Sequence, residues 1–282
     1  MAAEPLIRNI SDTAAWVAMY RAMESERSDA VFRDPYARRL AGTRGEEILR
    51  KMKAATKHAW SYVARTYVFD MYIAQEIAAG ADMIVNLAAG LDTRPYRMQL
   101  PSSLQWIEVD LPDLIANKEE ILRNEKPVCK LERVRLDLSD VNARRALFVE
   151  LGRRAKRVMV ASEGLIAYLT ADEACDLGKD LAAQPTFQRW AIDLISPKLL
   201  TMLQKQIGSP LRDAGAPLKF APEEGPAFFT KCGWKPIEVR SMLHTAKELK
   251  RLPFLYRLFA MFPDTKGTKP SQPWGGGVLL GR

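Results

Sequence analysis

The sequence is short of the residues that most directly reveal a function. Its 282 residues include two histidines and three cysteines, Cys129, Cys175 and Cys232. The cysteines are widely spaced and odd in number, so they fit neither a disulfide framework nor a zinc site, and we expect reduced, buried thiols in a cytoplasmic protein. Because no HExxH, paired Cys/His or GxSxG motif occurs, the sequence supports neither a metal centre nor a serine nucleophile.

Long apolar stretches are also missing. No run approaches the roughly 20 residues needed to cross a bilayer, and the first residues include Glu4 without an apolar core, unlike a secretory signal. The net charge of +8 would suit a nucleic-acid-binding protein. The basic residues are dispersed among acidic ones in helical patterns, however, which favours solvated helix faces. We therefore expect neither a membrane nor a nucleic acid as partner.

The pattern of apolar residues changes near residue 80. Residues 1–80 carry helical periodicity without strand signals and are expected to form an N-terminal helical cap. Residues 81–282 alternate strands with helices, which predicts an α/β domain with a doubly wound parallel sheet whose strand ends share one ligand-binding edge. The predicted strands are Met83–Leu87, Gln105–Val109, Glu132–Leu136, Arg157–Ala161 and Arg189–Leu194, and the helices between them are Leu111–Asn124, Val141–Arg154 and Ala171–Ala183.

The last third of the chain departs from this alternation. Residues 197–227 are rich in proline, glycine and lysine, and we expect a lid over the site with a short helix at Leu199–Gln206. Two late strands, Lys235–Arg240 and Trp274–Leu280, flank a helical patch at Ala246–Phe262. They are expected to pair antiparallel at the sheet edge.

The most informative stretch is Met83–Arg94, an apolar run that enters a turn containing Gly90. Asp110 follows twenty residues later, the spacing at which dinucleotide-binding folds place a carboxylate on a ribose. The turn lacks the three spaced glycines that cradle a pyrophosphate. That lack favours a cofactor with a nucleoside but no pyrophosphate, and leaves an NAD-dependent oxidoreductase as an alternative.

Further candidates lie at the ends of successive strands. Asp110 could accept the ribose hydroxyls and Asp137 the adenine amino group, while the Leu138 amide could donate to a ring nitrogen; alternatively, each aspartate is only a helix N-cap. Glu163 could hold a cofactor amino group or be a turn residue. Arg65 could pair with a cofactor carboxylate or lie on the surface.

At these residues the chain resembles the leucine carboxyl methyltransferase-like family, in particular its bacterial branch of S-adenosylmethionine-dependent O-methyltransferases. The most specific motif is Gly90-Leu91-Asp92-Thr93-Arg94-Pro95-Tyr96-Arg97. The order and spacing of other segments support it: Arg21–Ser25, Phe32–Pro35, Asn86–Ala89, Glu108–Pro112, Leu136–Leu138 and Glu163–Leu169.

The resemblance implies a class I methyltransferase fold, Rossmann-like, with a seven-stranded sheet and an antiparallel last strand. It also implies S-adenosyl-L-methionine as cofactor. The cofactor-binding roles that it implies are Arg65 for the methionine carboxylate, Gly90 and Asp92 in the turn near the amino-acid part, Asp110 for the ribose, Asp137 and Leu138 for the adenine, and Glu163 near the methionine. One departure is Ala88, where the family usually has glycine.

The methyl acceptor is less defined. A carboxylate needs no general base, so the scarcity of histidine favours a small carboxylic or phenolic acid as acceptor. We expect its pocket between the N-terminal helices and residues 197–227. Tyr168 is a candidate wall of this pocket or, alternatively, an aromatic residue of the core. A protein C-terminal carboxyl methyltransferase and a cofactor-binding protein without an acceptor remain alternatives, and no catalytic residue or oligomeric state follows from the sequence.

Overall fold

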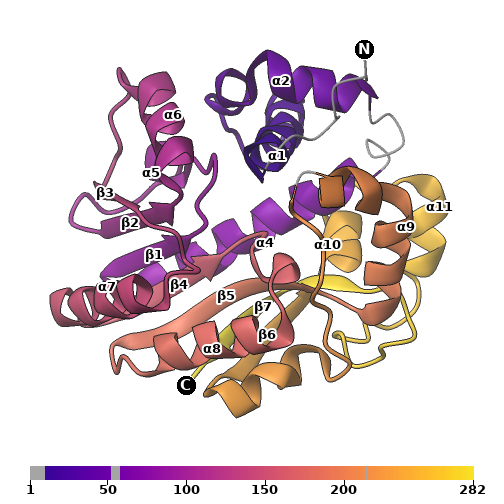
Figure 1. Cartoon of the computed structure of the whole chain (residues 1–282). Coiled ribbons are helices and arrows are strands. Elements are labelled where there is room, and N and C mark those ends of the chain that lie inside the picture. The colour runs from indigo at the N-terminus through magenta and orange to yellow at the C-terminus, as the bar shows by residue number, and fades with distance from the viewer. Residues whose placement is uncertain (1–9, 52–57, 214) are drawn as a thin grey trace.

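Seven strands form one sheet at the centre of the structure, a computed structural model that describes residues 10–51, 58–213 and 215–282 (Figure 1). The strand order across the sheet is β3-β2-β1-β4-β5-β7-β6. The strands are β1 (Met83–Leu87), β2 (Gln105–Asp110), β3 (Lys130–Arg135), β4 (Val158–Ser162), β5 (Phe187–Ile195), β6 (Lys235–Ser241) and β7 (Gly275–Gly281).

Strand directions confirm the predicted topology. Strands β1 to β5 pair in parallel, whereas β7 runs antiparallel between β5 and β6. A dinucleotide-binding sheet has the order 3-2-1-4-5-6, so the inserted antiparallel β7 distinguishes this sheet from it. The chain moves from β1 toward β3 on one side and restarts at β4 on the other, which places the switch of direction between β1 and β4.

Helices cover both faces of the sheet. Helices α7 and α8 pack on one face and α4 on the other, while α1 and α2 lie beyond the strand ends (Figure 1). The helices are α1 (Ile10–Ser25), α2 (Ala37–Lys51), α4 (Ala59–Ala78), α5 (Arg94–Arg97), α6 (Pro112–Leu122), α7 (Val141–Arg154), α8 (Ala171–Ala182), α9 (Pro197–Asp213), α10 (Met242–Glu248) and α11 (Phe254–Phe259), with 3-10 turns η1 (Ile166–Tyr168) and η2 (Gly225–Cys232).

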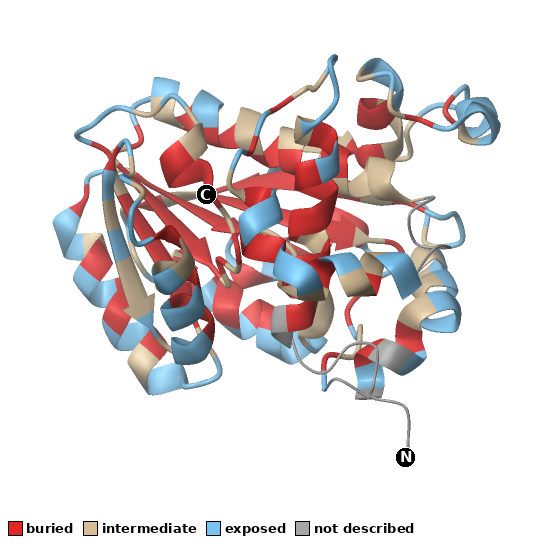
Figure 2. Cartoon of the chain, turned by 90° about the horizontal axis from the view of Figure 1, so that it is seen from above, coloured by how far each residue is buried: buried red, intermediate tan, exposed pale blue. Residues whose placement is uncertain are grey.

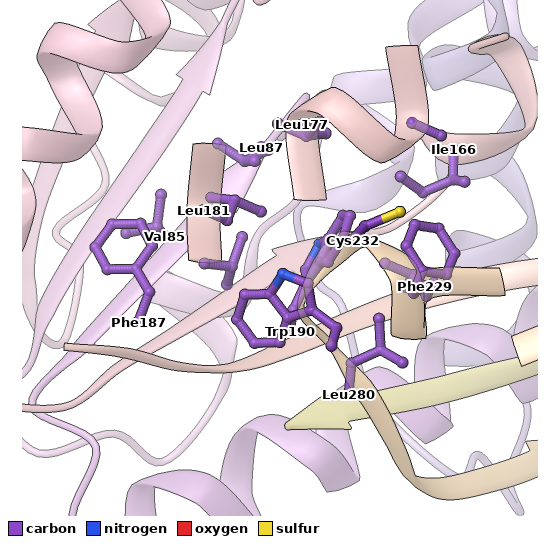
Figure 3. Close-up of a cluster of buried hydrophobic side chains, with 14 of the residues drawn as sticks. Val85, Leu87, Ile166, Leu177, Leu181, Phe187, Trp190, Phe229, Cys232 and Leu280 are labelled. Atoms are coloured by element: carbon purple, nitrogen blue, oxygen red, sulfur yellow. The ribbon is translucent and has the colours of Figure 1, made fainter. Parts of the chain in front are cut away.

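The central strands β1 and β4 are mainly apolar because both of their faces are covered. In β1, Val85 points toward α7 and α8, and its neighbour Ile84 points toward α4. Figure 2 shows the strands buried over most of their length. In the first of these two layers Trp190 of β5 packs edge-on against Phe229 of η2, as Figure 3 shows, and its Nε1 donates to Ser162 Oγ at 2.9 Å.

One glycine of β7, Gly277, allows α4 to approach the sheet closely. A methyl group on Gly277 would lie 2.6 Å from Val68 Cγ1, a separation that carbon atoms do not tolerate. The hydroxyl of Tyr72, one turn along α4, donates to the Gly277 carbonyl at 3.2 Å. Gly277 is therefore a packing surface for α4, whereas Gly275 lies against Leu199 of α9.

The expectation of three reduced thiols is wrong for two of them. Cys175 of α8 and Cys232 of η2 form a disulfide, with their Cα atoms 5.3 Å apart. Only Cys129 is a free, buried thiol, as expected. The two bridged residues are 57 positions apart in the sequence, and they meet because α8 and η2 pack side by side on the same face, which spacing alone does not reveal.

Helix lengths also differ from expectation in the last third. The short helix predicted at 199–206 is the longer α9, and the single patch predicted at 246–262 is divided into α10 and α11. Lys250, just after α10, has a left-handed φ of 58°, and Pro253 is the N-cap of α11, which together separate the two helices. Within the described residues no helix is long and apolar enough to cross a membrane.

Candidate active site

A cavity of about 350 Å³ opens at the carboxyl edge of the parallel strands. It lies at the switch point between β1 and β4, where open α/β sheets bind their ligands, and α1 and α9 form its outer wall. All seven residues predicted to bind the cofactor line it: Arg65, Gly90, Asp92, Asp110, Asp137, Leu138 and Glu163. Sequence segments separated by about a hundred residues thus contribute to one site.

The turn after β1 is held by Asp110 at the tip of β2. The carboxylate accepts hydrogen bonds from the amides of Gly90 at 2.6 Å and Leu111 at 2.8 Å. Both Ala88 and Gly90 have a φ of 51°, a left-handed conformation that costs alanine about 1 kcal/mol or more. Burial raises the pKa of Asp110, although the two amides and Lys118 oppose the shift. Each carboxylate oxygen keeps a further lone pair for a ligand.

Neither Asp110 nor Asp137 is a helix N-cap, so the alternative that each aspartate only caps the following helix is wrong. The N-cap of α6 is Leu111, and the N-cap of α7 is Asp140, whose carboxylate accepts from the Ala143 amide. Asp137 lies exposed at the cavity rim, where its side chain accepts from the Ser139 amide at 2.8 Å.

The backbone at the tip of β3 also faces the cavity. The Leu138 carbonyl accepts from Arg144 Nη1 at 2.9 Å, which fixes the peptide. Its amide donates to none of the residues that the structure describes. A donor and a carboxylate, Asp137, therefore stand side by side at one end of the cavity.

Arg65 is not a surface residue. Its side chain is 13% exposed and donates from Nε to Glu163 at 3.1 Å and from Nη1 to Asp193 at 3.2 Å. The guanidinium also lies over the ring of Tyr62. Because β4 carries Glu163 at its end and β5 carries Asp193, the sheet positions both carboxylates that orient this arginine.

Arg94 joins the carboxylates into a network. Only 3% exposed, it donates to Asp70 at 2.6 Å, to Asp92 at 2.8 Å and to Glu163 at 2.7 Å. Asp92 accepts further from Asn86 Nδ2 at 2.7 Å. Burial alone would raise the pKa of Asp92, but the charge of Arg94 and its neighbours holds that pKa well below its usual range. The carboxylate of Asp92 is therefore ionised and contributes a negative charge to the cavity lining.

Sequence reasoning missed three members of this network, Asn86, Asp70 and Asp193. Asp193 is a single carboxylate within the apolar strand β5, close to its carboxyl end, and that position was a usable signal. Burial raises its pKa, opposed by the charge of Arg65 and by the Gly164 amide, which donates to it at 2.6 Å. Asp70 lies on α4 and pairs with both Arg94 and Arg97, a contact that no sequence spacing predicts.

The opposite wall of the cavity is mainly apolar. Helix α1 contributes Trp16 and Val17, and α9 contributes one face at intervals of four residues; the apolar lining from α9 and the segment after it is Leu203, Ile207, Leu211 and Leu218. Tyr168 lines the cavity, the first of the two roles considered for it, and burial raises its pKa. Burial likewise raises the pKa of Tyr62 to about 12. Both phenols are neutral near pH 7, and the described lining contains no histidine or lysine.

This sheet and this site define a class I S-adenosylmethionine-dependent methyltransferase. Solved structures of the same fold include a protein of Thermobifida fusca provisionally named a methyltransferase, with a TM-score of 0.60 at 15% identity, covering 98% of this chain and 96% of that one. A DUF574 family protein from Streptomyces avermitilis also has a TM-score of 0.60, at 12% identity, covering 94% and 96% of the two chains. At such identities the likeness concerns the fold alone.

The family model of leucine carboxyl methyltransferases matches residues 14–182, and the chain belongs to this family. A relative from Parafrankia sp., provisionally named an S-adenosyl-L-methionine-dependent methyltransferase, is 31% identical over 255 residues, which is 86% of this chain and 82% of the relative. A Streptomyces coelicolor relative with the same provisional description is 38% identical over 132 residues. That match spans 43% of this chain and less than half, 46%, of the relative.

The residues present fit the cofactor of this class. The lining combines four arginines with five carboxylates, a small excess of negative charge that suits the sulfonium and ammonium groups of S-adenosylmethionine. The unpaired Leu138 amide and the remaining lone pairs of Asp110 suit the polar edges of a nucleoside. The switch-point cavity offers all of these groups within one space.

Proposed function

We propose that the protein is an O-methyltransferase that transfers a methyl group from S-adenosylmethionine to the carboxylate or acidic hydroxyl of a small molecule. The observation that carries the proposal is the division of the cavity. A floor of paired charges at the strand ends faces an apolar wall from α1 and α9, and the described lining provides no histidine or lysine.

In this proposal the charged floor holds the cofactor. Arg65 binds the methionine carboxylate, and Glu163 and Asp193, which already orient Arg65, accept from the methionine ammonium group. Asp110 accepts from the ribose hydroxyls, and the Asp137–Leu138 pair reads the adenine edge. Asp92 holds the turn after β1 in place through its contacts with Arg94 and Asn86. The cofactor supplies an electrophilic methyl group attached to a sulfonium sulfur.

The apolar wall positions the acceptor and keeps water out. The expected cap of residues 1–80 is reduced to α1 and α2 in this assignment, because α4 packs on the sheet. Helix α9 and the segment after it form the lid, with Trp16 and Ile207 facing the acceptor. An ionised carboxylate or phenolate attacks in line without giving up a proton, so the site needs no general base. Tyr62 and Tyr168 stay protonated near neutral pH and act as hydrogen-bond donors to the acceptor oxygen.

Two measurements test the proposal in sequence. Calorimetric titration with S-adenosylhomocysteine and with NAD separates the methyltransferase from the oxidoreductase, and we expect binding of the first alone. Labelled methyl transfer is then measured against a panel of small carboxylic and phenolic acids and against protein extracts. Label found only on a protein band would contradict the small-molecule acceptor and favour C-terminal carboxyl methylation instead.

A further inference from the structure

Helix α11 and the residues after it expose large apolar side chains. The exposed side chains are Phe254 (75%), Leu255 (70%), Leu258 (57%), Phe259 (64%), Met261 (74%) and Phe262 (69%). We call them the α11 surface. Elsewhere in the described residues the exposed large apolar side chains are scattered and reach at most 55%. A contiguous group of this kind marks an interaction site.

The α11 surface is held in place by the inner side of its own segment. Tyr256 and Ala260 pack into a cluster with Leu252, Ala246 and Ala64 of α4. Lys247 of α10 donates from Nζ to the Ala260 carbonyl at 2.9 Å, and His244 bonds to the Phe262 carbonyl at 3.0 Å. Because the segment is anchored at both ends, its outer side chains are presented to the surroundings in a fixed arrangement. Figure 1 shows α11 at the periphery of the molecule.

Basic residues flank the α11 surface in the sequence. Residues 245–270 contain six basic residues against two acidic ones; the basic residues are Lys247, Lys250, Arg251, Arg257, Lys266 and Lys269. Lys250, Arg257, Lys266 and Lys269 are exposed. A second copy of the chain docked through this surface would bring two basic borders together, whereas an anionic partner would be attracted by both.

We propose that the α11 surface docks the protein on an anionic lipid bilayer surface. Exposed phenylalanine and leucine side chains enter the boundary between head groups and acyl chains, while lysines and Arg257 contact anionic head groups. The peripheral, outward-pointing arrangement suits a soft apolar medium into which side chains insert. This surface lies outside the cavity, so the inference stands independently of the proposed methyl acceptor.

Vesicle flotation with the full chain tests this inference. Wild-type protein is expected to float with vesicles of phosphatidylcholine mixed with phosphatidylglycerol and to bind phosphatidylcholine alone far less, with the difference diminishing as salt is added. The double substitution Phe254→Ser/Phe259→Ser is expected to reduce partitioning more than tenfold. Lys250→Gln/Lys269→Gln is expected to weaken binding to the anionic vesicles about fivefold for each charge removed.

The matched control is Ile237→Ser, which removes an apolar side chain of 55% exposure on β6 and should leave partitioning unchanged. Equal binding of wild type and Phe254→Ser/Phe259→Ser would overturn the inference, as would an absence of binding to anionic vesicles. A wild-type mass that rises with concentration in light scattering, and falls to one chain in Phe254→Ser/Phe259→Ser, would assign the surface to a second copy instead.

Discussion

The two walls of the cavity are built on different principles. The floor consists of charged side chains at the ends of β1, β2, β4 and β5, and nearly every one of them is bound by another residue of the chain, as Arg94 is by three carboxylates. The wall from α1 and α9 consists mainly of apolar side chains, although Thr13 and Arg21 of α1 also line the cavity. A paired charge network has one arrangement, whereas an apolar wall can change shape with its side chains. We therefore expect the floor to bind one fixed ligand, the cofactor, and the wall to adapt to the shape of the acceptor.

The largest effect is expected at the centre of the floor. Replacing Arg94 by methionine leaves Asp92 and Glu163 buried beside an uncharged side chain, which should lower the free energy of unfolding by about 3–5 kcal/mol. Urea denaturation measures this. The control Arg123→Met removes an arginine that is 65% exposed and paired with Glu120, and a change below about 1 kcal/mol is expected there. Similar losses of unfolding free energy in both variants would show that Arg94 stabilises the fold no more than an exposed arginine does.

A smaller effect is expected when a floor residue keeps its shape and loses its charge. In Asp110→Asn one amide oxygen cannot accept from both the Gly90 and Leu111 amides, so the turn is distorted. Affinity for S-adenosylhomocysteine should fall by about 2 kcal/mol, on the order of thirtyfold. The control is Asp113→Asn on the exposed first turn of α6. Calorimetry that shows equal affinities for the two variants would contradict the assignment of Asp110.

The same residue predicts a pH dependence. Burial raises the pKa of Asp110, so the ionised carboxylate is present above the raised pKa and is lost as the pH falls through it. Affinity for S-adenosylhomocysteine should therefore weaken on acidification sooner than an ordinary aspartate would cause. The profile of Asp110→Asn should lack this step, and its retention would assign the step to another group.

The wall should respond differently. Ile207→Ser places a hydroxyl against the acceptor, and kcat/KM for the acceptor should fall about tenfold, with the affinity for S-adenosylhomocysteine unchanged. Met202→Ser, on the outer side of α9 and 38% exposed, should change neither quantity. A parallel loss of cofactor affinity in Ile207→Ser would show that the two walls are not independent.

The smallest effect is expected at the strained turn of the floor. Ala88 has a positive φ, so Ala88→Gly should raise the free energy of unfolding by about 1 kcal/mol after the greater backbone entropy of glycine is allowed for. Ala89→Gly, at a neighbouring position without positive φ, should be destabilising. Thermal and urea unfolding of the pair measure the difference, and two changes of equal sign would contradict the strain.

The sequence predicts the floor better than the wall because the floor follows strand ends. Each parallel strand places its last residues at the same edge, so Asp110, Asp137 and Glu163 could be placed together from their positions alone. Arg94 occurs in the most specific motif, but its three partners come from separate elements and appear only in the folded chain. The Cys175–Cys232 disulfide and the contact of Asp70 with Arg94 escaped prediction for the same reason, since both depend on how helices pack.

The α9 wall was predicted only as the segment 197–227, without its individual residues. Its residues at intervals of four form an ordinary amphipathic helix, and such a face is the same in a sequence whether it covers a core or a ligand. The exposed α11 surface was equally hidden, because its apolar residues resemble those of a buried helix. Burial, which decides both cases, depends on the position of the helix relative to the sheet.

Gly277 of β7 influences the position of Arg65, far from its own strand. Val68 rests on the backbone of Gly277, and Arg65 lies on the same helix three residues before it, so the depth at which α4 sits on the sheet sets the height of the guanidinium above the cavity floor. A methyl group added at Gly277 would push Val68, and with it α4, away from the sheet. The last strand thus acts as a spacer that sets the distance between Arg65, which we propose binds the cofactor, and the two carboxylates that orient it.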